Sequence, residues 1–409
     1  MLTALLIELR RSPVRWWAPV MVVVGLGWLF TRTGQWLSVW PQAAAAAQAT
    51  TVFLAPTSAA AAAIAAGRAH GPGVAELTAH VPRPRSQPQL AQLAASLLYG
   101  LTSFLVVTVV ALCSPWLKGV PSSSLWLGYT VLGLVCMIAG TALGHWTGLL
   151  LTGPAAPALA AVTMFAALGV IPSDSPYNLT VISGSPEYQI APAALAIRAL
   201  LAAGLLVAAV GWPQTRPRWG YLPIAPSLGI TTMVIAAVAL GPIGFPQVKR
   251  APLTQPLCSA TTPQVCVWPE NQSSLTKAAE AGQQVAKAAA GVLPVPPRFY
   301  ETGLQPNREA QAHGFSMRGG IEATTDDMIS EVLPHPPVCT DSFTTQQMSQ
   351  FADAYQNLSA WLFARATGPG TVSGDVPGAV HRILRQNAPE QTTWAREQAA
   401  TIQSIQCPD

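Results

Sequence analysis

The chain has 409 residues, of which 50% are hydrophobic and only 10% are charged. Soluble domains carry roughly 25% charged residues, so this composition excludes an ordinary soluble protein and indicates a chain largely solvated by lipid. The charge is unevenly divided, with a net +7 in residues 1–244 and −3 in residues 245–409. We therefore expect a membrane domain at 1–245 and a polar domain at 246–409. The basic residues flank apolar spans, so no nucleic-acid partner is predicted.

The N-terminal segment 1–11 is predicted to be an amphipathic helix on the cytoplasmic surface. Its leucines share one helical face: Leu2, Leu5, Leu6 and Leu9. Basic residues and an aromatic anchor follow: Arg10, Arg11, Arg15, Trp16 and Trp17. A cleaved signal peptide is the competing interpretation, because the alanine run at 43–47 could mimic a cleavage region. The further spans downstream favour a first helix that is retained.

About seven apolar stretches are long enough to be predicted as membrane spans. They lie at 14–30, 50–66, 93–113, 125–151, 155–170, 190–212 and 222–245. The second is the weakest, because alanine is only marginally apolar and Pro56 interrupts it. With the N-terminus inside, this count places the polar domain outside the cell.

The loop at 67–92, between the second and third spans, organises the topology. It holds Arg68, Arg83 and Arg85 but a single acid, Glu76. Basic loops stay on the cytoplasmic side, so fixing this loop there fixes all the others by alternation. Residues 73–80 could form one or two helical turns that contact a soluble motor; a loop that only sets topology is an equally good interpretation.

Six cysteines follow the same division. Cys113 and Cys136 lie in apolar sequence and read as packing residues. The other four, in the polar domain, are Cys258, Cys266, Cys339 and Cys407. Four cysteines suggest two disulfides and an oxidising compartment. Three pairings are possible; we favour a local Cys258–Cys266 loop and a Cys339–Cys407 clamp on the C-terminus.

The polar domain is predicted to have a small α+β fold. Helical patterns occupy 274–290 and 344–365, a short strand is expected near 322, and one or two helices close the chain between 375 and 407. The predicted fold class is thus an α-helical polytopic membrane protein followed by a small α+β extracytoplasmic domain with disulfides.

Neither part of the sequence carries a complete catalytic motif. No Gly-Lys pair occurs, so the chain lacks the usual phosphate loop of an ATPase. The outer histidines, His313, His335 and His381, lack zinc-site spacing and read as surface or structural residues. Ser316 has Arg318 where a hydrolase elbow needs glycine, and we expect a turn entering a strand. The acids Asp326, Asp327 and Glu331 read as a solvated helix start. We predict no enzyme, cofactor or metal site.

Two polar residues lie within predicted spans. Arg198 is eight residues into the sixth span, and a charge at that depth should face the bundle interior or reach outward. It could be a substrate-path or gating contact; a structural tie to a loop acid such as Glu187 or Asp174 is favoured. His145 could tie two helices together or sit at the interface, and here too the structural interpretation leads.

The amphipathic start and the 67–92 loop, with Gly-Val-Ala-Glu-Leu at 73–77 and Pro-Arg-Pro-Arg at 82–85, resemble ABC-2-type transporter permeases. The chain is most similar to actinobacterial permeases with an extracytoplasmic C-terminal domain, on the Cys-Val-Trp-Pro-Glu stretch at 266–270 and Leu-Pro-Val-Pro at 293–296. Such permeases commonly have six spans rather than seven.

The resemblance implies a multi-pass permease subunit of an exporter in the cell membrane, driven by a separate ABC ATP-binding subunit. It would form a homodimer, or a heterodimer with a second permease. Coupling would pass through the 67–92 loop, with Glu76 and Leu77 at its core and Arg83 and Arg85 beside them. The alternatives are a non-transporting membrane protein with a sensing or ligand-binding ectodomain, and, less favoured, an ectodomain hydrolase.

Overall fold

The computed structural model describes residues 2–32, 36, 39–68, 86–151, 153–172, 175–212, 224–305, 314–334, 344–368 and 377–404. The chain divides into two compact units, Met1–Lys249 and Arg250–Asp409. The boundary lies a few residues beyond the last apolar helix, where the hydrophobic composition ends.

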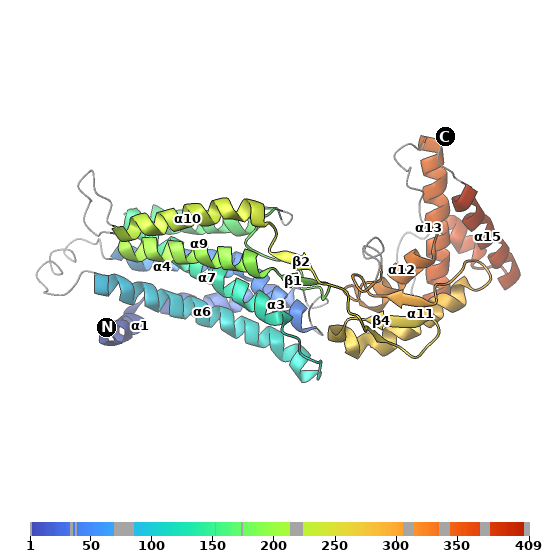
Figure 1. Cartoon of the computed structure of the whole chain (residues 1–409), viewed down its shortest axis with the longest axis horizontal. Helices are drawn as coiled ribbons and strands as arrows, with labels where there is room; N and C mark the ends of the chain where they lie inside the picture. The colour runs from blue at the N-terminus through green and yellow to red at the C-terminus, as the bar shows by residue number, and fades with distance from the viewer. Residues whose placement is uncertain are drawn as a thin grey trace, which may run out of the picture. The chain divides into compact units, whose positions relative to one another are not determined.

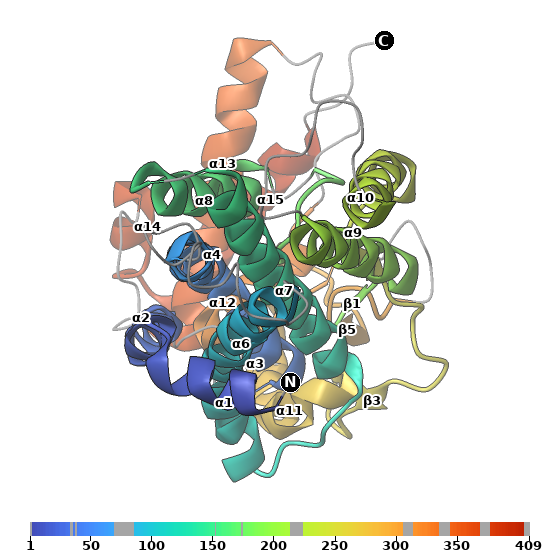
Figure 2. The ribbon, with the colours of Figure 1, turned by 90° about the vertical axis from the view of Figure 1, so that its left-hand side faces the viewer.

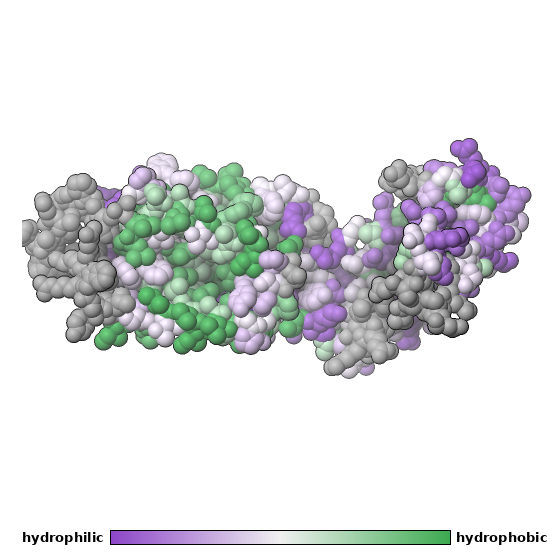
Figure 3. All heavy atoms as spheres, turned by 90° about the horizontal axis from the view of Figure 1, so that it is seen from above, coloured by the Kyte–Doolittle hydropathy of each residue, from purple (hydrophilic) through white to green (hydrophobic). Residues whose placement is uncertain are grey.

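The first unit is a bundle of apolar helices that run alongside one another (Figure 1). They are α1 (Leu2–Arg11), α2 (Val14–Phe30), α3 (Trp40–Ala49), α4 (Thr51–Gly67), α6 (Ser86–Leu117), α7 (Leu125–Leu150), α8 (Ala155–Phe165), α9 (Pro192–Gly211) and α10 (Ile224–Ile243). In the described part, five spans are long and apolar enough to cross a bilayer, or six if the bent pair α1–α2 is one. Figure 3 shows the apolar side chains gathered over these helices.

Two predicted spans are therefore short of the usual crossing length. The stretch at 14–30 is a 17-residue helix bent away from α1, and Ala155–Val170 is a shorter apolar helix whose last turn, η3 (Ala166–Val170), is a π-helix. The predicted number of about seven spans becomes five or six by length.

The second span is longer than predicted. The helices α3 and α4 together form a 28-residue span, Trp40–Gly67, so the alanines at 43–47 belong to a buried helix and not to a cleavage region. Of its apolar segment 72% is buried, compared with 22% for α10. The alanine-rich helix is thus an inner element, where small side chains allow neighbouring backbones to approach.

A glycine seam on α7 explains that burial. Gly140, Gly144 and Gly148 recur every four residues along one helical face and lie against α4. A Cβ at Gly144 would come within 2.0 Å of the carbonyl oxygen of Ala59, so only glycine fits there. In Figure 2, α7 lies between the α4–α8 side of the bundle and the α9–α10 pair.

A short antiparallel sheet closes the α9–α10 hairpin. Strand β1 (Tyr188–Ile190) precedes α9, and β2 (Gln247–Lys249) follows α10 and pairs with it. The side-chain amide of Gln247 donates to the hydroxyl of Tyr129 (2.8 Å) and to the carbonyl of Ser183 (2.7 Å). These two hydrogen bonds attach β2, the last element of the membrane unit, to α7 and to the loop before β1.

The second unit is an α+β domain, as predicted. A three-stranded sheet has the order β3 (Leu257–Cys258), β4 (Gln264–Val267), β5 (Arg298–Tyr300), with β3–β4 antiparallel and β4–β5 parallel. The helical elements are η4 (Pro269–Ser274, a 3₁₀ helix), α11 (Leu275–Ala289), α12 (Gly320–Val332), α13 (Thr345–Thr367), α14 (Gly378–Ile383) and α15 (Ala388–Ser404). The parallel β4–β5 pair is joined by α11, which makes the usual crossover connection.

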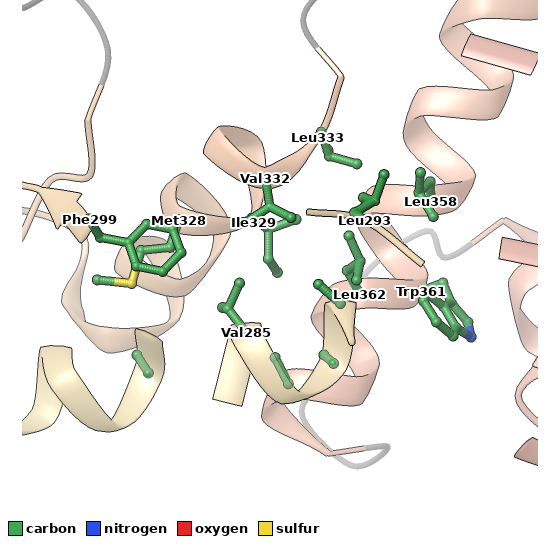
Figure 4. Packing of buried hydrophobic residues seen from close by; sticks show 14 of the residues in the cluster. Val285, Leu293, Phe299, Met328, Ile329, Val332, Leu333, Leu358, Trp361 and Leu362 are labelled. Atoms are coloured by element: carbon green, nitrogen blue, oxygen red, sulfur yellow. The ribbon is translucent and has the colours of Figure 1, made fainter. Parts of the chain in front are cut away.

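One apolar core holds this unit together (Figure 4). Phe299 and Met328 lie side by side at one end of it, and Leu358, Trp361 and Leu362 of α13 pack at the other. Helix α13 begins with a capping box. The hydroxyl of Thr344 accepts from the backbone N–H of Gln347, and the side-chain oxygen of Gln347 accepts from the backbone N–H of Thr344.

One element of this unit differs from the prediction. The strand expected near 322 is the helix α12, entered through a turn at 316–319. The turn after Phe315 therefore leads into a helix and not into a strand, although Phe315 itself forms an isolated bridge with Glu301.

Candidate functional site

The N-terminal helix bends sharply away from the first apolar helix. The axes of α1 and α2 differ by 65°, and Pro13 stands between them. Proline has no N–H to continue the α1 hydrogen-bond ladder, so the helix ends there. The exposed Leu2, Leu6 and Ile7 on α1 fit a helix lying in the bilayer surface. Figure 2 shows α1 turning away from α2 and running past α6.

This helix is attached to the two helices between which the predicted loop lies. Helix α4 ends at Gly67 and α6 already begins at Ser86, so residues 86–92 of the predicted loop are helical. Glu8 forms an ion pair with Arg68, at the end of α4 (3.3 Å). The hydroxyl of Tyr99, in α6, donates to the carbonyl of Leu9 (2.5 Å), and α1 packs along α6. The predicted coupling residues, Glu76, Leu77, Arg83 and Arg85, lie outside the described residues.

Arg198 is buried at the start of α9, with 1% of its surface exposed. Its guanidinium donates to three backbone carbonyls: those of Asn178 (2.6 and 3.1 Å), Pro176 (2.9 Å) and Ala194 (3.0 Å). Carbonyl dipoles stabilise a buried charge when several converge on it. This geometry is a structural tie between α9 and the loop at 176–178. Asp174, one of the acids suggested as a partner, lies outside the described residues.

His145 lies in the last third of α7 and is fully buried, next to the glycine seam. Neither ring nitrogen has a hydrogen-bond partner in the part of the chain that the structure describes. The polar tie between helices lies one turn earlier, where the hydroxyls of Ser58 and Thr141 are 2.7 Å apart. His145 is therefore buried inside the bundle, and its ring makes no polar tie to a described neighbour.

The Cys-Val-Trp-Pro-Glu stretch has a packing role in the second unit. Cys266 forms the predicted disulfide with Cys258, directly opposite it on the neighbouring strand. The Trp268 indole N–H donates to the carbonyl of Thr302 (3.0 Å), and its ring lies 4.3 Å from the guanidinium carbon of Arg250. Arg250 also pairs with the buried Glu270 (3.2 Å). The predicted partners Cys339 and Cys407 lie outside the described residues.

The acids Asp326, Asp327 and Glu331 do not lie at a helix start, although Asp326 is exposed as predicted. They occupy the second half of α12, which begins at Gly320. Burial raises the pKa of Glu331 to about 8, with the negative charge of Asp327 as a second cause. Burial also raises the pKa of Asp326 and of Asp327, while the backbone N–H of Ser316 donates to Asp327 (2.7 Å) and opposes the rise there.

Asp326 lines a groove between α12 and α13 with a volume of about 500 Å³. One wall carries the carboxylates of Glu322 and Asp326, and the other carries Tyr355 and Phe363. Burial and the charge of Asp326 raise the pKa of the Tyr355 hydroxyl. Carboxylates opposite aromatic rings are a chemistry suited to cations. Sequence reasoning missed this groove, because nothing in the pattern indicates that α12 lies beside α13.

The residues considered for hydrolysis are not brought together in the described part. The Ser316 hydroxyl accepts from the backbone N–H of Arg318 within the turn (3.2 Å). His381 lies on α14, while His313 and His335 fall outside the described residues. No group of three metal-binding side chains occurs among the residues the structure describes.

Residues 265–407 match a family described as a domain of unknown function (DUF7224). The match runs from β4 through α15, and so covers most of the second unit. It does not extend to the membrane helices. Neither curated proteins nor solved structures gave a match to the chain. The chain is thus a polytopic membrane protein that carries a DUF7224 domain.

Proposed function

We propose that the chain is the membrane-spanning permease subunit of an ABC-type exporter, coupled to a separate ATP-binding subunit through residues 67–92. The observation that carries the proposal is the attachment of α1 to both flanking helices, through Glu8–Arg68 and Tyr99–Leu9. A surface helix fixed in this way moves together with the ends of the loop. A push on the loop from a soluble motor would therefore reach α4 and α6 as one unit.

The proposed orientation has the N-terminus and residues 67–92 in the cytoplasm and the second unit outside. It requires the two short apolar helices, Val14–Phe30 and Ala155–Val170, both to cross the bilayer along with the five longer spans. Two independent features support it. The arginine-rich segments of the membrane unit lie at its N-terminus and in the loops at 67–92 and 213–223, as expected for inner loops. The Cys258–Cys266 disulfide belongs to the second unit and favours an oxidising compartment.

We further propose that two permeases assemble around one transport path, as a homodimer or as a heterodimer with a related chain. The helix α10 exposes a large apolar surface for its length, including Leu228 (60%) and Val238 (70%). Such an apolar surface can pack against lipid or against a second permease, and lipid would cover the part that the second permease does not contact.

The test is copurification from native membranes, followed by sequencing of the proteins that come with this chain, which should include an ATP-binding subunit. Glu76→Lys and Leu77→Asp should each reduce the amount of bound ATPase and its ATP-dependent function. Glu397→Lys, an exposed charge reversal on α15, is the matched control and should leave both unchanged. Retention of the ATPase at wild-type level by both loop variants would refute the coupling role.

A non-transporting membrane protein with a ligand-binding ectodomain is the second candidate, and the α12–α13 groove favours it. Spermidine is a suitable cationic probe, because the groove opposes carboxylates to aromatic rings. This candidate predicts no associated ATPase and a rise in unfolding temperature with spermidine that Asp326→Asn abolishes. An ATPase that copurifies, with no response to spermidine, would exclude it.

A further inference from the structure

A crevice of about 450 Å³ lies between α1, α2 and α6 in the membrane unit. Its walls are almost entirely apolar, and several rim residues are exposed, including Leu98 (45%) and Val106 (39%). The lining residues are Leu9, Ala18, Pro19, Val22, Leu98, Tyr99, Thr102, Ser103 and Val106. It is therefore a cleft that opens on the surface of a helix bundle expected to face lipid.

The three hydroxyl groups in the crevice are already satisfied by the protein itself. Tyr99 donates to the carbonyl of Leu9, Thr102 to that of Leu98, and Ser103 to that of Tyr99 at 2.8 Å. No donor on these three side chains is left for a polar ligand. Most of the wall surface is hydrocarbon, which suits an acyl chain and offers a polar molecule few partners.

Three arginines stand next to the end of the crevice that Leu9 lines. Arg10 and Arg11 follow Leu9 directly, and Arg15 lies on the next turn of chain with its guanidinium carbon 4.9 Å from the ring centre of Trp16. All three side chains are exposed. The acid of α1, Glu8, is paired with Arg68 and leaves their charge uncompensated. Clustered basic residues at a membrane surface attract anionic headgroups.

We propose that this crevice holds one acyl chain of an anionic phospholipid, whose headgroup is bound by Arg10, Arg11 and Arg15. The lipid would fill the angle between the surface helix α1 and the bundle. It would thereby support the bend at Pro13, a position where α1 otherwise contacts α2 only weakly.

Charge argues for lipid over a second copy of the chain as the occupant. Residues 1–244 carry a net charge of +7, and a second copy docked here about a two-fold axis would bring its own arginines towards Arg10 and Arg11. Like charges at that distance oppose association, whereas a phosphate headgroup neutralises them. The exposed Trp16, 68% accessible, also fits the headgroup region of a bilayer.

The acyl-chain part is tested by filling the crevice. The full chain is reconstituted in bilayers of equal phosphatidylglycerol and phosphatidylcholine, extracted in mild detergent, and its retained lipid counted by native mass spectrometry. Val106→Trp should reduce retained phosphatidylglycerol at least about tenfold. Val109→Trp places the same side chain three residues further along α6, outside the crevice and 59% exposed, and should retain lipid as the wild type does. Thr102→Phe is a second filling variant if Val106→Trp fails to fold.

The headgroup part is tested by charge. Arg10→Gln with Arg11→Gln should lower the preference for phosphatidylglycerol over phosphatidylcholine roughly tenfold or more. Lys277→Gln with Lys287→Gln removes the same charge from the second unit and should change nothing. Three results would overturn the proposal: lipid retained in both filling variants, no preference for the anionic lipid in the wild type, or a filling variant that changes the oligomeric state and leaves bound lipid unchanged. None of them bears on the ATPase partner.

Discussion

Replacing a glycine of the α7 seam with alanine should separate α4 from α7 and destabilise the membrane unit. At Gly144 the added Cβ would lie 2.0 Å from the carbonyl oxygen of Ala59 and 2.5 Å from its Cα. These are backbone atoms of a buried helix, so neither can rotate away. Relief requires the two helices to move apart by roughly 1 Å, which removes contacts along the whole seam.

The structure also predicts an order within the seam. The closest approach of the added Cβ to α4 is 2.4 Å at Gly148 and 2.9 Å at Gly140. Overpacking typically costs about 1–3 kcal/mol, so Gly144→Ala should cost about 3 kcal/mol, Gly148→Ala less, and Gly140→Ala least. Gly27→Ala is the matched control: nothing lies within 4 Å of its Cβ, and a helical alanine should stabilise α2 by about 0.5–1 kcal/mol.

The buried thiol of Cys136 on α7 provides the assay. Its alkylation by a maleimide, followed by peptide mass spectrometry at rising temperature, reports unfolding of the helices around it. For a unit of this size about 3 kcal/mol corresponds to a midpoint shift of roughly 6–12 °C. A Gly144→Ala midpoint equal to that of Gly27→Ala, or a reversed order among the three glycines, would refute the packing argument.

Three further predictions concern single side chains. The pKa of Glu331 is raised from 4.5 to about 8, so the stability it gives as a neutral acid is complete below about pH 4.5 and is lost as the pH rises towards 8. Glu331→Gln should therefore remove a pH dependence of stability on the order of 2–4 kcal/mol from the second unit and stabilise that unit at about pH 9. Thermal unfolding across pH measures both effects. Glu322→Gln, on the exposed first turn of α12, is the control and should leave the pH dependence unchanged. Arg198→Met should speed hydrogen exchange in residues 176–181, because it deletes hydrogen-bond donors worth about 1.5–3 kcal/mol each. Arg382→Met, at an exposed position, is the control. Unchanged exchange in the Arg198 variant would rule out the structural tie. Cys258→Ala with Cys266→Ala should cost about 2–3 kcal/mol and make stability insensitive to reductant, since the bridge closes a loop of sequence separation 8.

Hydropathy alone located most of the membrane helices. The apolar run predicted at 125–151 is the helix Leu125–Leu150, because every side of a buried or lipid-facing helix is apolar and the ends are marked by polar turns. The start of the second span was missed, because Ala43 to Ala47 are too weakly apolar to stand out. Ala44 and Ala45 are buried against Tyr129 and Leu132 of α7, which are distant in the sequence.

The sequence shows where buried polar residues lie more readily than it shows which groups they bond to. The depth of Arg198 indicated that it needs compensation, but its acceptors are carbonyls of an irregular loop, which every residue carries and no pattern distinguishes. The acids of α12 were placed at a helix start because acids favour that position. The helix begins earlier, at Gly320, so they lie in its second half, where Asp326 is exposed and Asp327 and Glu331 are half-buried.

The alanine-rich α4 has a consequence for biogenesis. Alanine gains little on leaving water for hydrocarbon, so this helix would be a poor candidate for independent release from a translocation channel into the membrane. Its stable position in the bilayer depends on α7, which is synthesised about 85 residues later, counted from Ala59 to Gly144. Until α7 emerges, α4 would have to wait beside the channel, which makes the interval between these two helices the vulnerable stage in producing this protein.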